Sequence, residues 1–204
     1  MKLAIFGGTF DPIHRGHLAV ARAAAGRFGL DRILFVPAAH PPHKSGATSA
    51  PYGARVRMAE LACAGEPRVE VSRLEENTPL SYSVDTIEKV RAGMAPGDEL
   101  FFIIGADAFA EIQTWRRRRD VARGVVFLVV SRPGHIYEIP EGIRMERLDT
   151  LQLPISSSEI RAELAAGERP AALPEAVLDY VFEHGLYGAP GRDSGGEESR
   201  SVGS

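Results

Sequence analysis

The sequence predicts an α/β fold: a doubly wound, mainly parallel sheet of the Rossmann-like kind, with helices on both faces and a small helical part at the C-terminus. Two observations lead to this prediction. Short, nearly continuous apolar runs alternate along the chain with longer segments of helical period. The runs are apolar at consecutive rather than alternate positions, which is typical of parallel strands that are covered on both faces.

The expected strands are short, rich in branched and aromatic side chains, and followed by turn-forming residues. In chain order they are residues 2–6, 32–36, 69–73, 100–104 and 125–130, with 144–147 as a last strand. The runs 100–104 and 125–130 are the densest apolar segments, and both are far shorter than the roughly 18 to 20 residues of a membrane span. They are therefore expected to be buried strands.

The expected helices repeat apolar residues every three or four positions. They are residues 16–28, 52–63, 83–92, a short section around 108–122, 158–166 and 174–184. No internal repeat or linker divides this series, so we expect residues 1–187 to form a single nucleotide-binding domain. Residues 188–204 are rich in Gly, Ser, Glu and Arg without an apolar period, and we expect a disordered tail there.

Composition limits the classes of function. The 204 residues are 44% hydrophobic and carry a net charge of −3, which gives no general attraction to nucleic acid or to an anionic membrane. Cys63 is the only cysteine, which excludes an internal disulfide and a cysteine-built zinc site. The N-terminus shows no secretory pattern, so we expect a cytoplasmic protein.

Polar and glycine-rich segments follow four of the expected strands. They begin at Gly7, Pro37, Gly105 and Ser131. Because the carboxyl ends of parallel strands meet at one edge of a sheet, where such folds bind their ligands, we expect a ligand site at this edge.

Residues 7–17, Gly-Gly-Thr-Phe-Asp-Pro-Ile-His-Arg-Gly-His, join the first strand to a helix. The free N–H groups and positive end of a helix N-terminus attract phosphate. Gly7 and Gly8 would let a ligand approach the backbone closely. His14 and His17 would donate hydrogen bonds to a phosphate that gains negative charge as it reacts. The segment has neither the glycine spacing of a dinucleotide fingerprint nor the lysine of a Walker loop, and it predicts nucleotide chemistry.

Two further segments combine stiff or hydroxyl-bearing residues with charge. Residues 40–44, His-Pro-Pro-His-Lys, end in Lys44, which suits a phosphate or carboxylate; a solvated loop is the alternative, and His43 need not bind metal. Residues 81–86 enter a helix with Ser83 as the expected N-cap. Capping alone would explain this segment as well as contact with a ligand does.

Two more segments also begin helices. Gly105 and Asp107 follow a buried strand, where a carboxylate commonly holds ribose hydroxyls; helix capping is the alternative. Residues 155–161, Ile-Ser-Ser-Ser-Glu-Ile-Arg, place hydroxyl and N–H groups at a helix start with Arg161 one turn later, which predicts a second anion site. Capping would explain one of these serines, but not all of them together with the arginine.

Together these motifs resemble those of the bacterial nicotinate-nucleotide adenylyltransferases, in the nucleotidyltransferase superfamily with the signature (T/S)-x-x-H-x-G-H. The resemblance runs from about residue 2 to residue 187, and it includes Trp115 and the Ser-Arg-Pro-Gly of residues 131–134. It implies an enzyme of NAD biosynthesis that makes nicotinate adenine dinucleotide and pyrophosphate from ATP and nicotinate mononucleotide, with Mg²⁺. No metal-ligating set of side chains is expected, and a homo-oligomer stays open.

The resemblance also implies roles for residues at matching positions. The residues implied to bind ATP are Gly7, Gly8, Thr9, Phe10, His14, His17, Gly105, Asp107, Ser157 and Arg161. The residues implied to bind the mononucleotide are Thr9, His43, Lys44, Ser83, Trp115 and Arg116. The residues implied to act in catalysis are His14, His17, Lys44 and Arg161. Ser157 and Arg161 would hold the β- and γ-phosphates, while Ser83 and Trp115 would line the nicotinate pocket.

One position departs from the family pattern, which often has tyrosine after this tryptophan. Here the residue is Arg116, the first of a run that ends at Arg119. Such a run is typical of a solvated helix face; the alternative is that Arg116 favours the nicotinate carboxylate.

Three rival functions stay open. Phosphopantetheine adenylyltransferases share the H-x-G-H chemistry, but residues 42–44 and 81–86 speak against that substrate. Nicotinamide mononucleotide is the amidated alternative acceptor. A nucleotide-binding regulator without catalysis is the rival from another class, and the presence of His14, His17, Lys44 and Arg161 argues against it.

Overall fold

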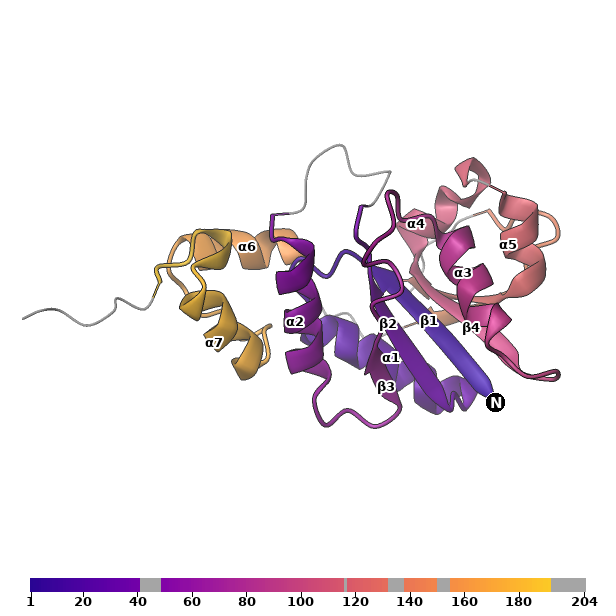
Figure 1. Ribbon diagram of the computed structural model, residues 1–204, viewed down its shortest axis with the longest axis horizontal. Coiled ribbons are helices and arrows are strands. Elements are labelled where there is room, and N and C mark those ends of the chain that lie inside the picture. Colours follow the sequence, from indigo (N-terminus) through magenta and orange to yellow (C-terminus); the bar gives the residue numbers. More distant parts are fainter. Residues whose placement is uncertain (41–48, 116, 132–137, 150–154, 192–204) are drawn as a thin grey trace, which may run out of the picture.

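The computed structural model describes residues 1–40, 49–115, 117–131, 138–149 and 155–191. Its centre is a six-stranded parallel sheet in the order β3-β2-β1-β4-β5-β6 (Figure 1). The strands are β1 (Lys2–Gly8), β2 (Arg32–Pro37), β3 (Val69–Val71), β4 (Glu99–Gly105), β5 (Val126–Ser131) and β6 (Met145–Asp149). The strand order reverses between β1 and β4, which confirms the predicted doubly wound, Rossmann-like sheet.

Both faces of the sheet are buried. In β1, Ile5 lies beside Leu34 of β2 and Phe102 of β4 and packs into one core cluster, while Ala4 and Phe6 pack into the other. Successive side chains of a strand point to opposite faces, so a strand buried on both sides must be apolar at consecutive positions. The continuous apolar runs of the sequence have this cause.

Helices cover each face of the sheet. They are α1 (Arg15–Phe28), α2 (Tyr52–Cys63), α3 (Ser83–Ala92), α4 (Ala106–Ala110), α5 (Arg118–Gly124), α6 (Ser157–Ala165) and α7 (Glu175–Glu183), with 3-10 turns η1 (Ile112–Thr114) and η2 (Leu186–Gly188). Helices α1 and α2 pack on the face of Phe6, and α3, α4 and α5 on the face of Ile5 (Figure 1). The expected elements are all present, with shifted limits.

The helices α6 and α7 form the small C-terminal part beside α2 (Figure 1). It is joined to the start of α1, because the backbone N–H of Arg15 donates to the carbonyl of Ala172 at 2.8 Å. The folded part continues beyond residue 187, its expected end: Gly188 closes η2, and Ala189 is buried in the apolar cluster of α1 and α2. Residues 192–204 of the expected tail lie outside the described residues.

Two other boundaries differ from the sequence prediction. The N-cap of α3 is Tyr82 rather than Ser83, which is the first helical residue. The section expected around 108–122 is divided into α4, η1 and α5; Arg117, the residue before α5, takes a left-handed backbone conformation with φ 52°.

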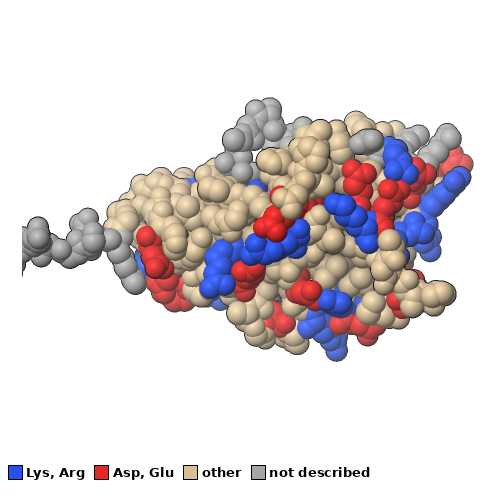
Figure 2. All heavy atoms as spheres, in the orientation of Figure 1, with Lys and Arg blue, Asp and Glu red and all other residues tan. Residues whose placement is uncertain are grey.

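The surface carries charges of both signs side by side on the face shown in Figure 2. Several of them form ion pairs, such as Arg73 with Glu60 at 2.8 Å and Arg117 with Glu88 at 2.7 Å. Within the described ranges, no helix combines the length and the apolar character that crossing a membrane would require.

Candidate active site

Most of the predicted site residues that the structure describes lie at the carboxyl edge of the sheet. There the chain after β1 and the chain after β4 lead to helices on opposite faces. Gly7 and Gly8 end β1, and the following turn leads to the N-terminus of α1. The N-terminus of α6 lies against the same turn, since Ser157 Oγ donates to the carbonyl of Pro12 at 3.2 Å. The fold thus joins the two anion sites that the sequence predicts separately.

His14 and His17 form a stacked pair at the start of α1. His14 is the N-cap, and its ring lies on that of His17 with centroids 3.7 Å apart and an interplanar angle of 24°. The backbone N–H of His14 donates to Nδ1 of His17 at 3.2 Å. Because Nδ1 accepts this hydrogen bond, the neutral His17 ring carries its proton on Nε2.

Burial keeps this pair neutral at pH 7. Burial lowers the pKa of His14 from 6.5 to about 4. The pKa of His17 also lies well below 6.5, because of burial and then because of the nearby His14. Nδ1 of His14 is buried without a hydrogen-bond partner among the described residues. Each neutral ring carries one N–H and no charge, and on His17 this N–H is at Nε2.

Aromatic side chains pack around His17. The ring of Phe10 meets it edge-on, with centroids 5.0 Å apart, and the ring of Phe6 lies 5.9 Å away. Phe10 is only 2% exposed, yet its φ is 48°, a backbone conformation that costs a bulky residue roughly 1–3 kcal/mol. Packing of the Phe10 ring against Phe6 and Phe35 offsets this strain.

The carbonyl groups of the turn are bound from inside the protein. The pairs are Gly8 O with the Ala38 N–H (2.8 Å), Thr9 O with Arg55 (2.7 Å), Asp11 O with Arg161 (2.7 Å) and Pro12 O with Ser157 (3.2 Å). Since these acceptor groups face donors of the protein, they do not face a ligand. A ligand at the turn would therefore not meet these negatively polarised oxygens, which suits an anion.

Arg161 and Ser157 project from the first two turns of α6. The Arg161 guanidinium donates to the Asp11 carbonyl and to Ser158 Oγ, the latter at 3.2 Å. Ser156 is the residue that caps the helix, by accepting from the Ser158 N–H. Capping therefore explains one serine, as the sequence suggests, and Ser157 and Arg161 have a different role.

On the opposite face of the sheet, Trp115 packs against aromatic rings of β4 and β5. Its ring centroid lies 6.1 Å from that of Phe102 and 6.4 Å from that of Phe127. Phe102 also lies beneath Gly7, where an added Cβ would come within 3.4 Å of its ring. Trp115 and Ser83 both belong to this side of the sheet, since Tyr82 and Trp115 pack on the same core cluster.

The remaining predicted residues are exposed or undescribed. Gly105 ends β4 as the N-cap of α4, with open space where its Cβ would be, and Asp107 is exposed in the first turn of that helix. Arg117, in the arginine run, forms surface ion pairs with Glu88 and Asp120, as expected for a solvated face. His43, Lys44 and Arg116 lie outside the described residues.

Two buried charged residues, Asp11 and Arg55, were not identified as functional from the sequence. The Asp11 carboxylate accepts from the N–H groups of Ser49 (2.7 Å) and Ala50 (3.1 Å) and from the Tyr187 hydroxyl (2.8 Å). Burial lowers the pKa of Arg55, against the opposing effect of Asp11. The missed signal was spacing: Arg55 stands in helical phase with Met58, Ala59 and Ala62 on the buried side of α2.

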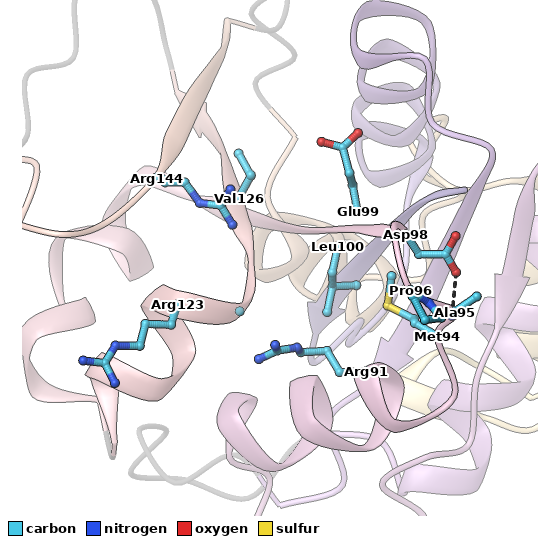
Figure 3. Close-up of a pocket in the computed structure, with 11 residues that line it drawn as sticks. Arg91, Met94, Ala95, Pro96, Asp98, Glu99, Leu100, Arg123, Val126 and Arg144 are labelled. Atoms are coloured by element: carbon cyan, nitrogen blue, oxygen red, sulfur yellow. Dashed lines mark hydrogen bonds between the residues drawn. The ribbon is translucent and has the colours of Figure 1, made fainter.

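A pocket of about 460 Å³ lies at the opposite, amino edge of the sheet (Figure 3). It is lined by side chains of both signs, including Arg91, Arg144 and Glu99, while Arg123 points away from it. It is separate from the His14–His17 turn. Within the described ranges, no group of three or more His, Cys, Asp or Glu side chains is arranged to hold a metal ion.

Comparison with known proteins identifies relatives of this chain. A family profile described as cytidylyltransferase-like matches residues 5–163. A protein of Solibacter usitatus named "Probable nicotinate-nucleotide adenylyltransferase" is 71% identical over 187 residues, which cover 92% of this chain and 100% of the relative. A protein of Thermus thermophilus with the same name is 45% identical over 190 residues, with the same coverage of both chains.

Solved structures show the same fold. The nicotinic acid mononucleotide adenylyltransferase of Plasmodium falciparum, complexed with NaAD, superposes with a TM-score of 0.74 at 20% identity, covering 91% of this chain and 97% of that one. The same enzyme complexed with APC gives a TM-score of 0.73 at 19% identity, covering 91% and 96%.

We predict that Gly16 is required for the histidine stack. An alanine Cβ at this position would lie 3.0 Å from Nδ1 of His14, in the buried ring pair. Gly16→Ala should therefore displace the His14 ring and lower the free energy of unfolding by about 1–3 kcal/mol, measured by urea denaturation. The control is Gly26→Ala in the same helix, where an added Cβ would meet no atom within 4 Å other than its own chain neighbours and the helix backbone, and a gain of about 0.5–1 kcal/mol is expected. Equal gains for both variants would contradict the prediction.

We predict that the histidine pair makes stability depend on pH. The pKa of His14 is about 4 in the folded protein and 6.5 without the fold, so its stabilising effect is complete above pH 6.5 and is lost as the pH falls toward 4. The loss from His14 amounts to roughly 3 kcal/mol. His14→Phe should lose correspondingly less stability over this range than the parent protein, measured by urea denaturation. Parallel pH profiles for the two proteins would contradict the neutral pair, and His184→Phe, at an exposed position, is the control.

Proposed function

This chain belongs to the cytidylyltransferase-like family and, within it, to the nicotinate-nucleotide adenylyltransferases; we propose that it transfers the adenylyl group of ATP to nicotinate mononucleotide. The products are nicotinate adenine dinucleotide and pyrophosphate. The observation that carries this proposal is the neutral His14–His17 stack, placed at a helix N-terminus against the start of α6. Transfer between two polyanions needs such a set of donors.

The histidine pair would act on the α-phosphate of ATP. The acceptor phosphate oxygen attacks the α-phosphorus in line, the bond from that phosphorus to the bridging oxygen breaks, and pyrophosphate leaves. Charge grows on the phosphate oxygens at this stage, and N–H groups of His14 and His17 that are already in place would stabilise it. The acceptor is itself the nucleophile, so no covalent intermediate with the protein is needed.

Arg161 and Ser157 would bind the leaving β- and γ-phosphates. Both side chains now donate to carbonyls of the turn, at Asp11 and Pro12, so they lie directly beside the backbone of Gly7–Phe10 that would bind the same triphosphate. Gly105 and Asp107 would contact the adenylate side at the end of β4.

The acceptor would bind on the α3 side of the sheet. Thr9 and Lys44 would hold its phosphate, His43 would belong to the same substrate site, and Ser83 with Trp115 would line the nicotinate pocket. The packing of Phe102 beneath Gly7 and beside Trp115 supports this location, since it brings that side of the sheet next to the turn. For Arg116, contact with the nicotinate carboxylate is the alternative to a solvated helix face.

Mg²⁺ would enter with ATP. This ion prefers oxygen ligands and commonly binds substrate phosphates while it retains several waters, so it requires few ligands from the protein. The donor-rich turn fits a metal that is carried by the nucleotide, and the bound ion would neutralise phosphate charge. The protein's own part is to align the two nucleotides, which can lower the barrier by roughly 7–11 kcal/mol in favourable cases.

We predict that the protein releases pyrophosphate from ATP with nicotinate mononucleotide, and much less with nicotinamide mononucleotide. A site built for a carboxylate leaves buried polar groups unpaired when it binds the amide. The measurement is a paired assay of kcat/KM with both mononucleotides, with phosphopantetheine as a third acceptor. Preference for the amide or for phosphopantetheine would contradict the proposed substrate, and no release with any acceptor would favour the regulator.

Two variants test the histidine pair within this assay. His17→Ala should lower kcat on the order of 10²–10³-fold while affecting ATP binding much less, because its N–H acts mainly on charge that develops during transfer. His184→Ala, on the exposed end of α7, is the matched control and should retain activity. Equal losses in kcat and in ATP affinity would reduce the histidines to binding contacts.

A further inference from the structure

Arg55 is a fully buried cation whose hydrogen bonds join three separate segments. It has 0% exposure. Its guanidinium donates to Thr9 O at 2.7 Å, to Ala38 O at 2.8 Å and, through Nε, to Ala50 O at 3.1 Å. These carbonyls belong to the turn after β1, the segment after β2 and the entry to α2. A guanidinium fork suits this task, because its donors point in fixed, coplanar directions.

Arg55 extends the pairing of the two strands beyond the end of the sheet. The β1–β2 ladder ends where Gly8 lies beside Pro37. One further backbone bond follows, from the Ala38 N–H to Gly8 O at 2.8 Å. Arg55 then binds the next carbonyl of each strand, Thr9 and Ala38, through the same Nη1. This Nη1 therefore adds to the Ala38–Gly8 backbone bond in fixing the relative position of the two loops.

The hydrogen bond to Thr9 also fixes an N–H group. In a trans peptide the carbonyl oxygen and the following N–H point in opposite directions. Because Arg55 holds Thr9 O inward, the N–H of Phe10 must face away from Arg55. Gly7–Phe10 is the backbone that the proposed function assigns to the ATP phosphates.

The segment at Ala50, at the entry to α2, is bound both by Arg55 and by the Asp11 carboxylate. Ala50 is fully buried; its carbonyl accepts from Arg55, while its N–H donates to the Asp11 carboxylate at 3.1 Å. One peptide segment is thus held between a buried cation and a buried anion. The anion is Asp11, which lies in the turn after β1.

We propose that Arg55 is a positioning residue: it orients the Phe10 N–H toward the ATP phosphates and fixes the loop after β1 against the segments that precede and begin α2. The proposal rests on the proposed function in assigning the phosphates to this turn. The effect of Arg55 on nucleotide binding can be measured without turnover. The role of Arg55 and the proposed function can therefore fail separately.

The test compares Arg55→Lys with Arg57→Lys in the same helix. Arg57 is exposed and pairs with Glu60 at 3.4 Å, so it controls for the loss of a guanidinium from α2. Lysine keeps the charge at position 55 but cannot reproduce the fork. The measurements are the Kd of an ATP analogue with a methylene bridge between the α- and β-phosphorus, amide exchange at Phe10, and melting temperature.

Arg55→Lys should fold, raise the Kd of the analogue about tenfold or more, and lose the slowing of Phe10 amide exchange that the analogue causes in the parent protein. Where the parent is active, kcat should fall and KM for ATP should rise, whereas Arg57→Lys should match the parent within about twofold. A lower melting temperature with unchanged Kd and unchanged Phe10 exchange would overturn the proposal. Failure of Arg55→Lys to fold would also overturn it, by assigning Arg55 to stability alone. If the parent protein binds the analogue but has no activity, the proposed function is contradicted. The Kd and the Phe10 exchange of Arg55→Lys still decide whether Arg55 is a positioning residue.

Discussion

The orientation of the peptide groups between Gly8 and Pro12 is the constraint on which the site depends. The carbonyls of Gly8, Thr9, Asp11 and Pro12 are bound by donors from β2's end, α2 and α6. A turn that faced a triphosphate with these oxygens would repel it. Buried and partly buried donors from distant parts of the chain therefore hold these oxygens before any ligand arrives, as the proposed binding of an anion at this turn requires.

The same constraint explains why so much of the chain is needed for one site. Asp11 accepts from the Tyr187 hydroxyl and from the entry to α2, so the C-terminal part and α2 meet at the turn after β1. Helix α6 of the small C-terminal part contributes Arg161 and Ser157, which lie 150 and 145 residues along the chain from the carbonyls they bind. Long-range contacts of this kind are what allow separate substrate loops to keep a fixed geometry.

Much of this arrangement could be predicted from the sequence, because the signals were local. Continuous apolar runs predicted the parallel strands, and the glycine-rich segments after them predicted the ligand edge. For Arg55, the helical phase that it shares with Met58, Ala59 and Ala62 indicates burial, but its role leaves no mark in the sequence, because its partners are backbone carbonyls. Tyr82 rather than Ser83 is the N-cap of α3, and its side chain packs on the core instead of capping the helix, a position that a search for hydroxyl caps does not find. The left-handed backbone at Arg117, which splits one expected helical section, likewise has no glycine to reveal it.

The turn presents neutral imidazole rings, with the proton of His17 on Nε2. Nitrogen NMR of the ligand-free protein, with ¹⁵N-labelled histidine, tests this most directly. At pH 7 both His14 and His17 should show the shifts of neutral rings, and Nδ1 of His17 should show those of an unprotonated nitrogen that accepts a hydrogen bond. An imidazolium signal for either residue at pH 7, or a proton on Nδ1 of His17, would contradict this picture of the site.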